Sequence, residues 1–257
     1  RESTQPDLQT TAGPSWKPLP AAFTTVFALL GDAAPALWVV IARAGWVAAV
    51  LLAFRVARRL GGGVAGGLAA AGALAVAPWM VRNGGLANSE PLLVALLLAA
   101  VDRHRAGDRR AAFLLGVGAG LLRPEAWPFL AVFGAWALWR RELGPRLVVG
   151  AGLATVALWT LPEWWGSGDP LRAMSRAQDP NPGAAAFADD PVVRILSDAQ
   201  EMLVVPVEVG LVVALGAALW RRDRSLAALL AVGAGWLAIV AVMTADGGFS
   251  GNQRYLI

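Results

Sequence analysis

The sequence predicts an all-α protein, a polytopic transmembrane helical bundle with short re-entrant or interfacial helices. Of its 257 residues, 57% are hydrophobic and only 16% are charged, which is too little charge for the surface of a soluble domain of this length. Several apolar segments approach the roughly 20 residues that an α-helix needs to cross a bilayer. No segment alternates between polar and apolar residues, so the pattern does not indicate a β-barrel.

The first third of the chain contains three apolar segments. Residues 19–30 are too short to span a membrane and are expected to form an interfacial or re-entrant helix, which Gly31 and Asp32 end. Residues 33–54 and 62–80 are expected to be the first two spans. An arginine-rich turn separates them, as is typical of the end of a transmembrane helix.

The middle of the chain contains three shorter apolar pieces, at 90–101, 111–122 and 126–139. Ser89-Glu90-Pro91 predicts a helix start, because serine is favoured at the N-cap and proline in the first turn. Arg123-Pro124-Glu125 separates the last two pieces. We expect these two to form a hairpin that returns to the side of the membrane that it left.

Three further apolar segments, at 147–161, 202–220 and 226–243, complete the expected bundle. Residues 162–200 are rich in proline, aspartate, glycine and tryptophan and are predicted to form a polar extracytoplasmic loop. Residues 1–257 are expected to be a single transmembrane domain. Because the sequence starts without methionine and ends inside an apolar run, we expect it to be a fragment truncated at both ends.

The basic residues predict the orientation of the bundle. More than half of them fall in four groups, at 55–59, 103–110, 140–146 and 221–224. All four groups lie on one side if the hairpin returns, and the positive-inside rule makes that side cytoplasmic. We therefore expect a multi-pass protein of the plasma membrane whose polar cavity faces the extracytoplasmic side. Because the arginines are spread over short loops, no nucleic-acid-binding surface is expected.

Two cations occupy positions that invite a functional interpretation. Lys17 is the single lysine among 22 basic residues and lies between prolines where a polar leader meets the apolar chain. Its compact ammonium could bind a phosphate at the membrane surface, or could simply extend to the interface. Arg43 lies on the order of 15 Å into the first span, where an unpaired charge costs several kcal/mol.

Acidic residues are expected on the same outer half of the bundle, among them Glu90, Glu125 and Glu208. They could form structural ion pairs, such as Arg43 with Glu90 or Glu208. Alternatively, cations and carboxylates share one cavity, in which the cations hold an anionic lipid-linked substrate and a carboxylate serves as base. The chain has no cysteine and one histidine, His104, in an expected solvated basic loop, so neither a metal nor a cofactor is predicted.

Several short motifs occur along the chain in an order that resembles the GT-C superfamily of integral-membrane glycosyltransferases. The resemblance is to the branch of protein O-mannosyltransferases, aminoarabinose transferases and related lipid A and cell-wall sugar transferases. The motifs that carry it are Lys17-Pro18-Leu19-Pro20, Gly31, Arg43, Glu90, Leu121-Leu122-Arg123-Pro124 and Arg254-Tyr255-Leu256. The order Pro18-Leu19-Pro20 departs from the Pro-Pro-Leu of the family, and residues 162–200 have no counterpart in it.

The resemblance implies transfer of a sugar from a polyprenyl-phosphate donor to an envelope lipid, glycan or protein on the extracytoplasmic face. It implies that Lys17 binds the lipid phosphate, that Glu90 is a catalytic carboxylate, and that Arg43, Arg123 and Arg254 are substrate-binding cations. It places the principal catalytic carboxylate upstream of Arg1. The alternatives are a non-catalytic membrane protein of envelope assembly and a transporter of an anionic lipid or solute.

Overall fold

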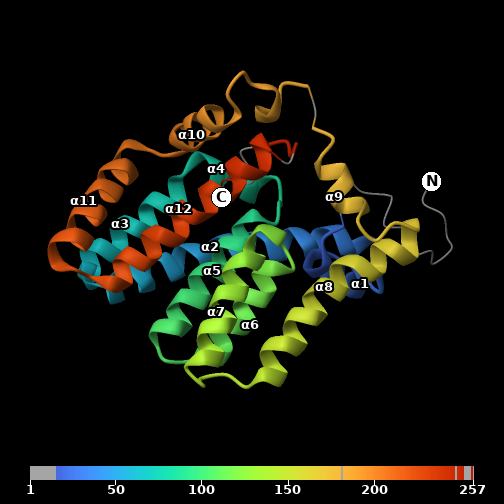
Figure 1. Ribbon diagram of the computed structural model, residues 1–257, viewed down its shortest axis with the longest axis horizontal. Helices are drawn as coiled ribbons and strands as arrows, with labels where there is room; N and C mark the ends of the chain where they lie inside the picture. Colours follow the sequence, from blue (N-terminus) through green and yellow to red (C-terminus); the bar gives the residue numbers. More distant parts are fainter. Residues whose placement is uncertain (1–15, 181, 247, 252–255, 257) are drawn as a thin grey trace.

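The computed structural model describes residues 16–180, 182–246, 248–251 and 256, and every regular element among them is a helix (Figure 1). The prediction of an all-α protein is therefore confirmed for this part of the chain. Arg254, one of the predicted binding residues, lies outside the described residues.

The first part of the chain folds into two long helices and several short ones. These elements are α1 (Pro18–Ala28), the 3₁₀ turn η2 (Gly31–Ala33), α2 (Ala34–Ala57), the π-turn η3 (Arg58–Gly62), α3 (Gly63–Val76) and α4 (Pro78–Gly85). Gly61 leaves the helical conformation with a φ of 98°, so the chain turns there and α3 packs against α2. The short helix and the two following helices match the expected segments, except that α3 ends early.

The expected span over residues 62–80 is wrong at its end. Pro78 disfavours the helical conformation for the residue before it. Ala77 is accordingly extended, with a ψ of 123°, and the chain starts a separate helix, α4, at Pro78. Residues 81–85 therefore belong to α4 and not to the preceding span.

The middle of the chain follows the predicted hairpin arrangement. Its elements are α5 (Glu90–Arg105), α6 (Arg109–Gly120), the 3₁₀ turn η4 (Pro124–Ala126), α7 (Trp127–Trp139) and α8 (Pro145–Ser167). Asp108 accepts a hydrogen bond from the backbone N–H of Ala111, so it is the N-cap of α6. Helix α6 packs against both α5 and α7, as expected for helices joined by short turns.

The last part of the chain is more helical than its polar composition indicates. Its elements are α9 (Arg172–Ala177), the 3₁₀ turn η5 (Ala185–Phe187), α10 (Pro191–Met202), α11 (Val205–Arg221) and α12 (Arg224–Ala245). The prediction of a loop over 162–200 is therefore wrong in its secondary structure, because α8 continues through Pro162 and two helices follow.

Close backbone contact holds α2 against α5. A Cβ on Gly45 of α2 would lie 2.8 Å from Leu92 Cα and 2.9 Å from Leu92 N, closer than real Cβ atoms approach backbone. Glycine at this position therefore sets the distance between the two helices. Gly67 of α3 is similarly close to Phe54 of α2, whereas Gly66 has nothing within 4 Å.

Three helical runs in the described residues are long and apolar enough to cross a membrane: Gly31–Val76, Pro145–Ser167 and Arg224–Ala245. The number rises to five if two bent helix pairs, α4 with α5 and α10 with α11, each count as one span. Large apolar side chains, including Leu51, Leu68, Leu219 and Trp220, are exposed on these helices. Such a surface is typical of a lipid-facing bundle.

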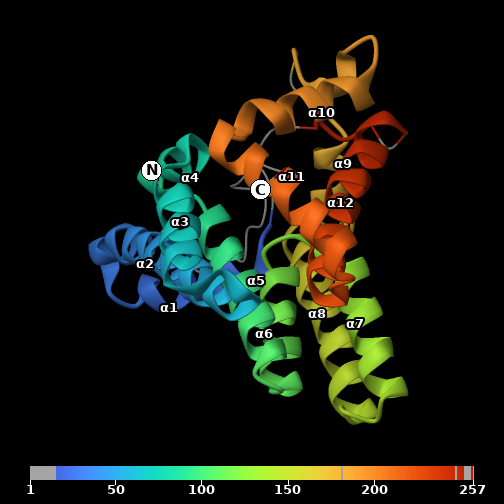
Figure 2. The same ribbon diagram turned by 90° about the vertical axis from the view of Figure 1, so that its left-hand side faces the viewer.

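Different elements lie at the two ends of the structure. Helices α4 and α10 lie at the top of both views, whereas the α5–α6 and α7–α8 turns lie at the bottom (Figures 1 and 2). The two turns at the bottom carry two of the basic groups, and the start of α5 points toward the opposite end. Two of the four basic groups therefore lie together at one end of the structure, away from the start of α5.

Candidate functional site

The segment around Lys17 is fixed by two hydrogen bonds that the sequence did not reveal. The indole N–H of Trp16 donates to the backbone carbonyl of Leu158, four residues before Pro162, at 2.9 Å. Proline has no N–H, so this carbonyl lacks the bond that an uninterrupted helix would give it. The backbone N–H of Leu19 donates to the carbonyl of Leu121 at 3.3 Å. These two bonds place Lys17 between α8 and the end of α6.

Lys17 meets the start of α5 in this position. Its Nζ donates a hydrogen bond to Ser89 Oγ at 3.2 Å, and Ser89 is buried. Ser89 occupies the N-cap position of α5, but its side chain makes no cap bond to the helix backbone. The hydroxyl of the serine expected as a helix cap instead accepts a hydrogen bond from the lysine ammonium, 72 residues away in the chain.

Glu90 and Arg123 form a buried ion pair directly beside this contact. Arg123 Nη2 lies 2.6 Å from Glu90 Oε1, and the two side chains are 8% and 0% exposed. Glu90 lies in the first turn of α5, where the helix dipole favours a carboxylate. Arg123 is extended, with a φ of −145° and a ψ of 119°, because Pro124 follows it. Of the alternative pairings considered for Glu90, the one with Arg43 is therefore not observed, and the partner is Arg123.

The turn that presents Arg123 is held by two tryptophans. The carbonyl of Gly120 lies four residues before Pro124, so it also lacks the N–H that would follow in a continuous helix. The indole N–H groups of Trp127 and Trp159 both donate to it, at 3.0 Å and 2.9 Å. Indole donors therefore hold the backbone at the end of α6, next to Arg123, as Trp16 does at Leu158 of α8.

Glu125 is the remaining carboxylate of this turn. It is 5% exposed and lies in η4, two residues after Arg123. Its Oε2 is buried and has no hydrogen-bond partner among the described residues. The sequence placed Glu125 among the outer acidic residues, but did not single it out as a site residue.

Arg43, another predicted site residue, does not join this group. Arg43 is exposed on α2 and makes no hydrogen bond or ion pair with any described residue. The candidate site therefore consists of Lys17, Ser89, Glu90 and Arg123 at the start of α5. It combines two cations with one carboxylate and one hydroxyl, groups of the kind that bind a phosphate. Glu125 follows Arg123 by two residues and lines a separate small cavity.

A second charged cluster lies at the other end of α5. The buried carboxylate of Asp102 accepts hydrogen bonds from three arginine side chains, those of Arg55, Arg59 and Arg103, at 3.0, 2.6 and 2.9 Å. All three arginines are partly exposed. The cluster joins the end of α2 and the π-turn η3 to the end of α5, so it has a clear structural role.

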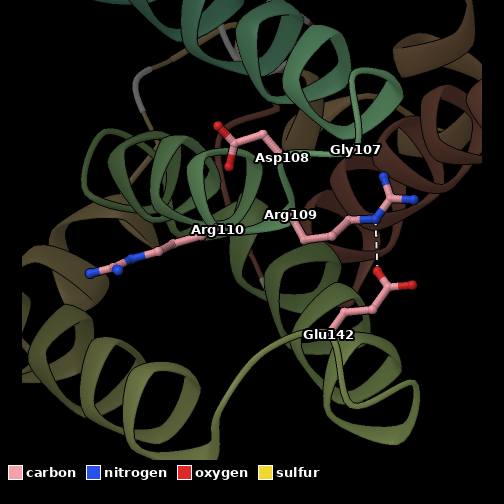
Figure 3. A pocket seen from close by; sticks show the side chains of 5 residues that line it. All are labelled: Gly107, Asp108, Arg109, Arg110 and Glu142. Carbon is pink, nitrogen blue, oxygen red and sulfur yellow. Dashed lines mark hydrogen bonds and ion pairs between the residues drawn. The ribbon is translucent and has the colours of Figure 1, made fainter.

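An open pocket of about 410 Å³ lies near this cluster, at the α5–α6 turn. Its lining includes Arg109, whose Nε lies 2.7 Å from Glu142 Oε2. Figure 3 shows these two side chains facing each other while Arg110 points away. His104 lies beside Phe133 and Trp136, with ring centroids 5.4 Å and 5.6 Å away. It belongs to helix α5 and is half-buried, so its expected place in a solvated loop is wrong.

Nothing in the described residues forms a group of three or more His, Cys, Asp or Glu side chains that could hold a metal ion. Comparison of the chain with protein-family models, with curated proteins and with solved structures gave no match. The functional interpretation therefore rests on the geometry of the site and on the order of the sequence motifs.

Proposed function

We propose that this protein is a multi-pass protein of the plasma membrane whose candidate site faces the extracytoplasmic side. The apolar helices supply the lengths that spans require. The arginine-rich α5–α6 and α7–α8 turns lie at the end opposite the candidate site, and arginine-rich loops are retained in the cytoplasm. In this proposal Glu90, at the start of α5, lies toward the extracytoplasmic side, and Asp102, near the end of α5, lies toward the cytoplasmic side.

The proposed activity is transfer of a sugar from a polyprenyl-phosphate donor to an envelope lipid, glycan or protein. The observation that carries this proposal is the convergence of Lys17, Ser89, Glu90 and Arg123, because a lysine ammonium held beside a buried arginine suits the phosphate of a lipid donor. The resemblance to GT-C glycosyltransferases, which rests on the same lysine, glutamate and arginine, agrees with this chemistry.

In the proposed reaction, an acceptor hydroxyl attacks the anomeric carbon of the sugar and the bond from that carbon to the phosphate oxygen breaks. The electron pair of the broken bond remains on the departing lipid phosphate. The hydroxyl proton passes to the principal catalytic carboxylate, which the resemblance places upstream of Arg1. Lys17 stabilises the charge that develops on the phosphate. Glu90 holds Arg123 in place and adds a second carboxylate to the site.

A non-catalytic role in envelope assembly is the second candidate, and one observation favours it. Glu90 and Arg123 neutralise each other at 2.6 Å, as a purely structural ion pair would. The two candidates differ in Lys17, since a structural pair between α5 and η4 does not need the lysine. Substitution of Lys17 therefore separates them.

The test is sugar transfer in isolated membranes from a labelled polyprenyl-phosphate sugar pool. The full-length wild type is compared with Lys17→Ala and Glu90→Gln at matched expression. Arg110→Gln is the control, because it removes an exposed arginine from the start of α6, beside the end of α5 that lies away from the candidate site. Wild type and control should transfer label, and the two site variants should lose transfer. If no donor is consumed, or if both site variants match the wild type, the proposal is wrong.

A further inference from the structure

The buried carboxylate of Glu125 is not used by the reaction described above. It is 5% exposed, its Oε2 has no hydrogen-bond partner among the described residues, and it forms no ion pair with them. Burial of a carboxylate without a partner is costly, so such groups are uncommon in native proteins and call for an occupant or a function. In a membrane bundle, an ionisable residue inside the protein is a candidate functional site.

A small cavity lies beside this carboxylate. Its volume is about 10 Å³, and it is lined by Glu125, Val240, Met243, Thr244, Phe249 and Gly251. A space of this size holds roughly one water molecule or one group of similar size. The cavity is therefore suited to a single hydroxyl group rather than to a whole sugar ring.

The polar groups of the cavity define what can occupy it. Thr244 Oγ1 already donates its hydrogen to the carbonyl of Val240 at 2.8 Å, so only its lone pairs remain available. Glu125 offers carboxylate oxygens, and the other lining side chains are apolar or absent. An occupant must therefore supply a hydrogen-bond donor. One carboxylate and one hydroxyl are too few ligands for a metal ion.

The segment after α12 covers the cavity at close range. The backbone N–H of Phe249 donates to the carbonyl of Met243 at 3.2 Å. Gly251 has a φ of 59°, and a Cβ there would lie 2.6 Å from Thr244 Cγ2 and 2.9 Å from Ala185 Cβ. Both the backbone conformation and the contact require glycine at this position. The covering segment is thus packed against the cavity.

Glu125 follows Arg123 by two residues, and Arg123 forms the ion pair with Glu90. Arg123 is directed toward Glu90 of α5, whereas Glu125 lines a cavity with residues of α12. The turn therefore joins Arg123, a cation of the proposed phosphate site, to the carboxylate of Glu125, which can accept a hydrogen bond from a ligand.

We propose that Glu125 binds one hydroxyl group of the sugar carried by the lipid phosphate, and so distinguishes the sugar-bearing donor from the bare lipid phosphate. The inference rests on the proposed function. Lys17 and the Arg123 side of the turn contact the phosphate, and the cavity beside Glu125 receives a hydroxyl of the attached sugar.

The test measures the Kd of the purified full-length protein in nanodiscs for decaprenyl phosphate and for decaprenyl phosphate carrying mannose or aminoarabinose. Wild type should bind one of the sugar-bearing lipids about tenfold more tightly than decaprenyl phosphate, as expected for a hydrogen bond to a buried charged group. Glu125→Ala should abolish this preference without changing the Kd for decaprenyl phosphate. Glu201→Gln, which alters an exposed glutamate of α10, should keep the preference.

The outcomes separate the inference from the proposed function. If wild type binds none of the lipids, the proposed function fails. If wild type binds decaprenyl phosphate but has no preference for a sugar, or if Glu125→Ala keeps the preference, the role of Glu125 is refuted. If Glu125→Ala does not fold, the isosteric Glu125→Gln decides the question by the same two Kd values. A structural water in the cavity predicts an unchanged preference together with lower stability of the alanine variant.

Discussion

The buried ion pair between Glu90 and Arg123 offers a quantitative test of the structure. We predict that Glu90→Gln and Arg123→Gln each destabilise the protein strongly, because each leaves the other partner's charge at a site that is almost fully buried. The double variant Glu90→Gln/Arg123→Gln removes both charges and leaves two neutral amides. It should therefore be more stable than the sum of the single effects predicts.

The magnitude follows from the burial and the distance. The side chains are 0% and 8% exposed, and the N–O distance is 2.6 Å, so solvent screens this pair very little. Breaking a buried pair costs about 3 to 5 kcal/mol for each single variant. The interaction energy from the double-mutant cycle should be about 2 kcal/mol, near the upper part of the range for residues in contact.

The assay is the free energy of unfolding in mixed detergent micelles, measured for wild type, both single variants and the double variant. The pair between Arg140 and Glu142 is the control, since its N–O distance is 3.9 Å and its arginine is 58% exposed. An exposed pair should give a coupling of about 0.5 kcal/mol or less. Additive effects of Glu90 and Arg123, with a coupling no larger than that of the control, would refute the buried pair.

Three further predictions concern stability. Trp16→Phe should lower the free energy of unfolding by about 1 kcal/mol, because it removes the N–H donor to the Leu158 carbonyl, which has no helical partner. In a Pro162→Ala background that carbonyl regains a helical partner, so the loss should be smaller. An equal loss in both backgrounds would contradict the role given to this hydrogen bond. Gly45→Ala should destabilise the protein by about 1 to 3 kcal/mol because its Cβ meets the backbone of α5, whereas Gly66→Ala should be neutral or stabilising, and equal thermal shifts would be inconsistent with this packing. Glu125→Gln should raise the thermal midpoint, because it removes a buried charge without a hydrogen bond; a lower midpoint would show that the carboxylate is satisfied.

The sequence predicts most of the helices because their limits coincide with proline, glycine and charged residues. Gly61 ends one helical run, and the Arg123-Pro124-Glu125 turn separates α6 from α7 as expected. Helix α10 could also have been found, since Asp190 accepts a hydrogen bond from Val193 N and Pro191 occupies the first helical position. The loop prediction for 162–200 relied on the polar composition of this region and did not use these local signals.

The continuation of α8 through Pro162 could not be predicted from local sequence. Proline normally ends or bends a helix because it leaves a carbonyl without its donor. In this protein Trp16 supplies a donor to that carbonyl from a segment 142 residues away, and no local pattern contains that contact. The same logic applies to Gly120, whose carbonyl receives two indole donors.

The candidate site is partly foreseen by the sequence. Unusual charges in apolar surroundings drew attention to Lys17, Glu90 and Arg123, and the structure brings these three together. The same reasoning placed Arg43 with them, and in the structure Arg43 is instead exposed on α2. A sequence gives the depth of a residue along a helix but not the direction in which its side chain points, so this exposure could not be predicted.

The central claim is that Lys17 holds the phosphate of a polyprenyl lipid at the start of α5. The most direct measurement is the Kd for decaprenyl phosphate of the purified full-length protein in nanodiscs, for wild type, Lys17→Gln and Arg110→Gln. Loss of one charge-assisted hydrogen bond should raise the Kd of Lys17→Gln about tenfold or more, while Arg110→Gln should match the wild type. Equal Kd values for wild type and Lys17→Gln would contradict the claim.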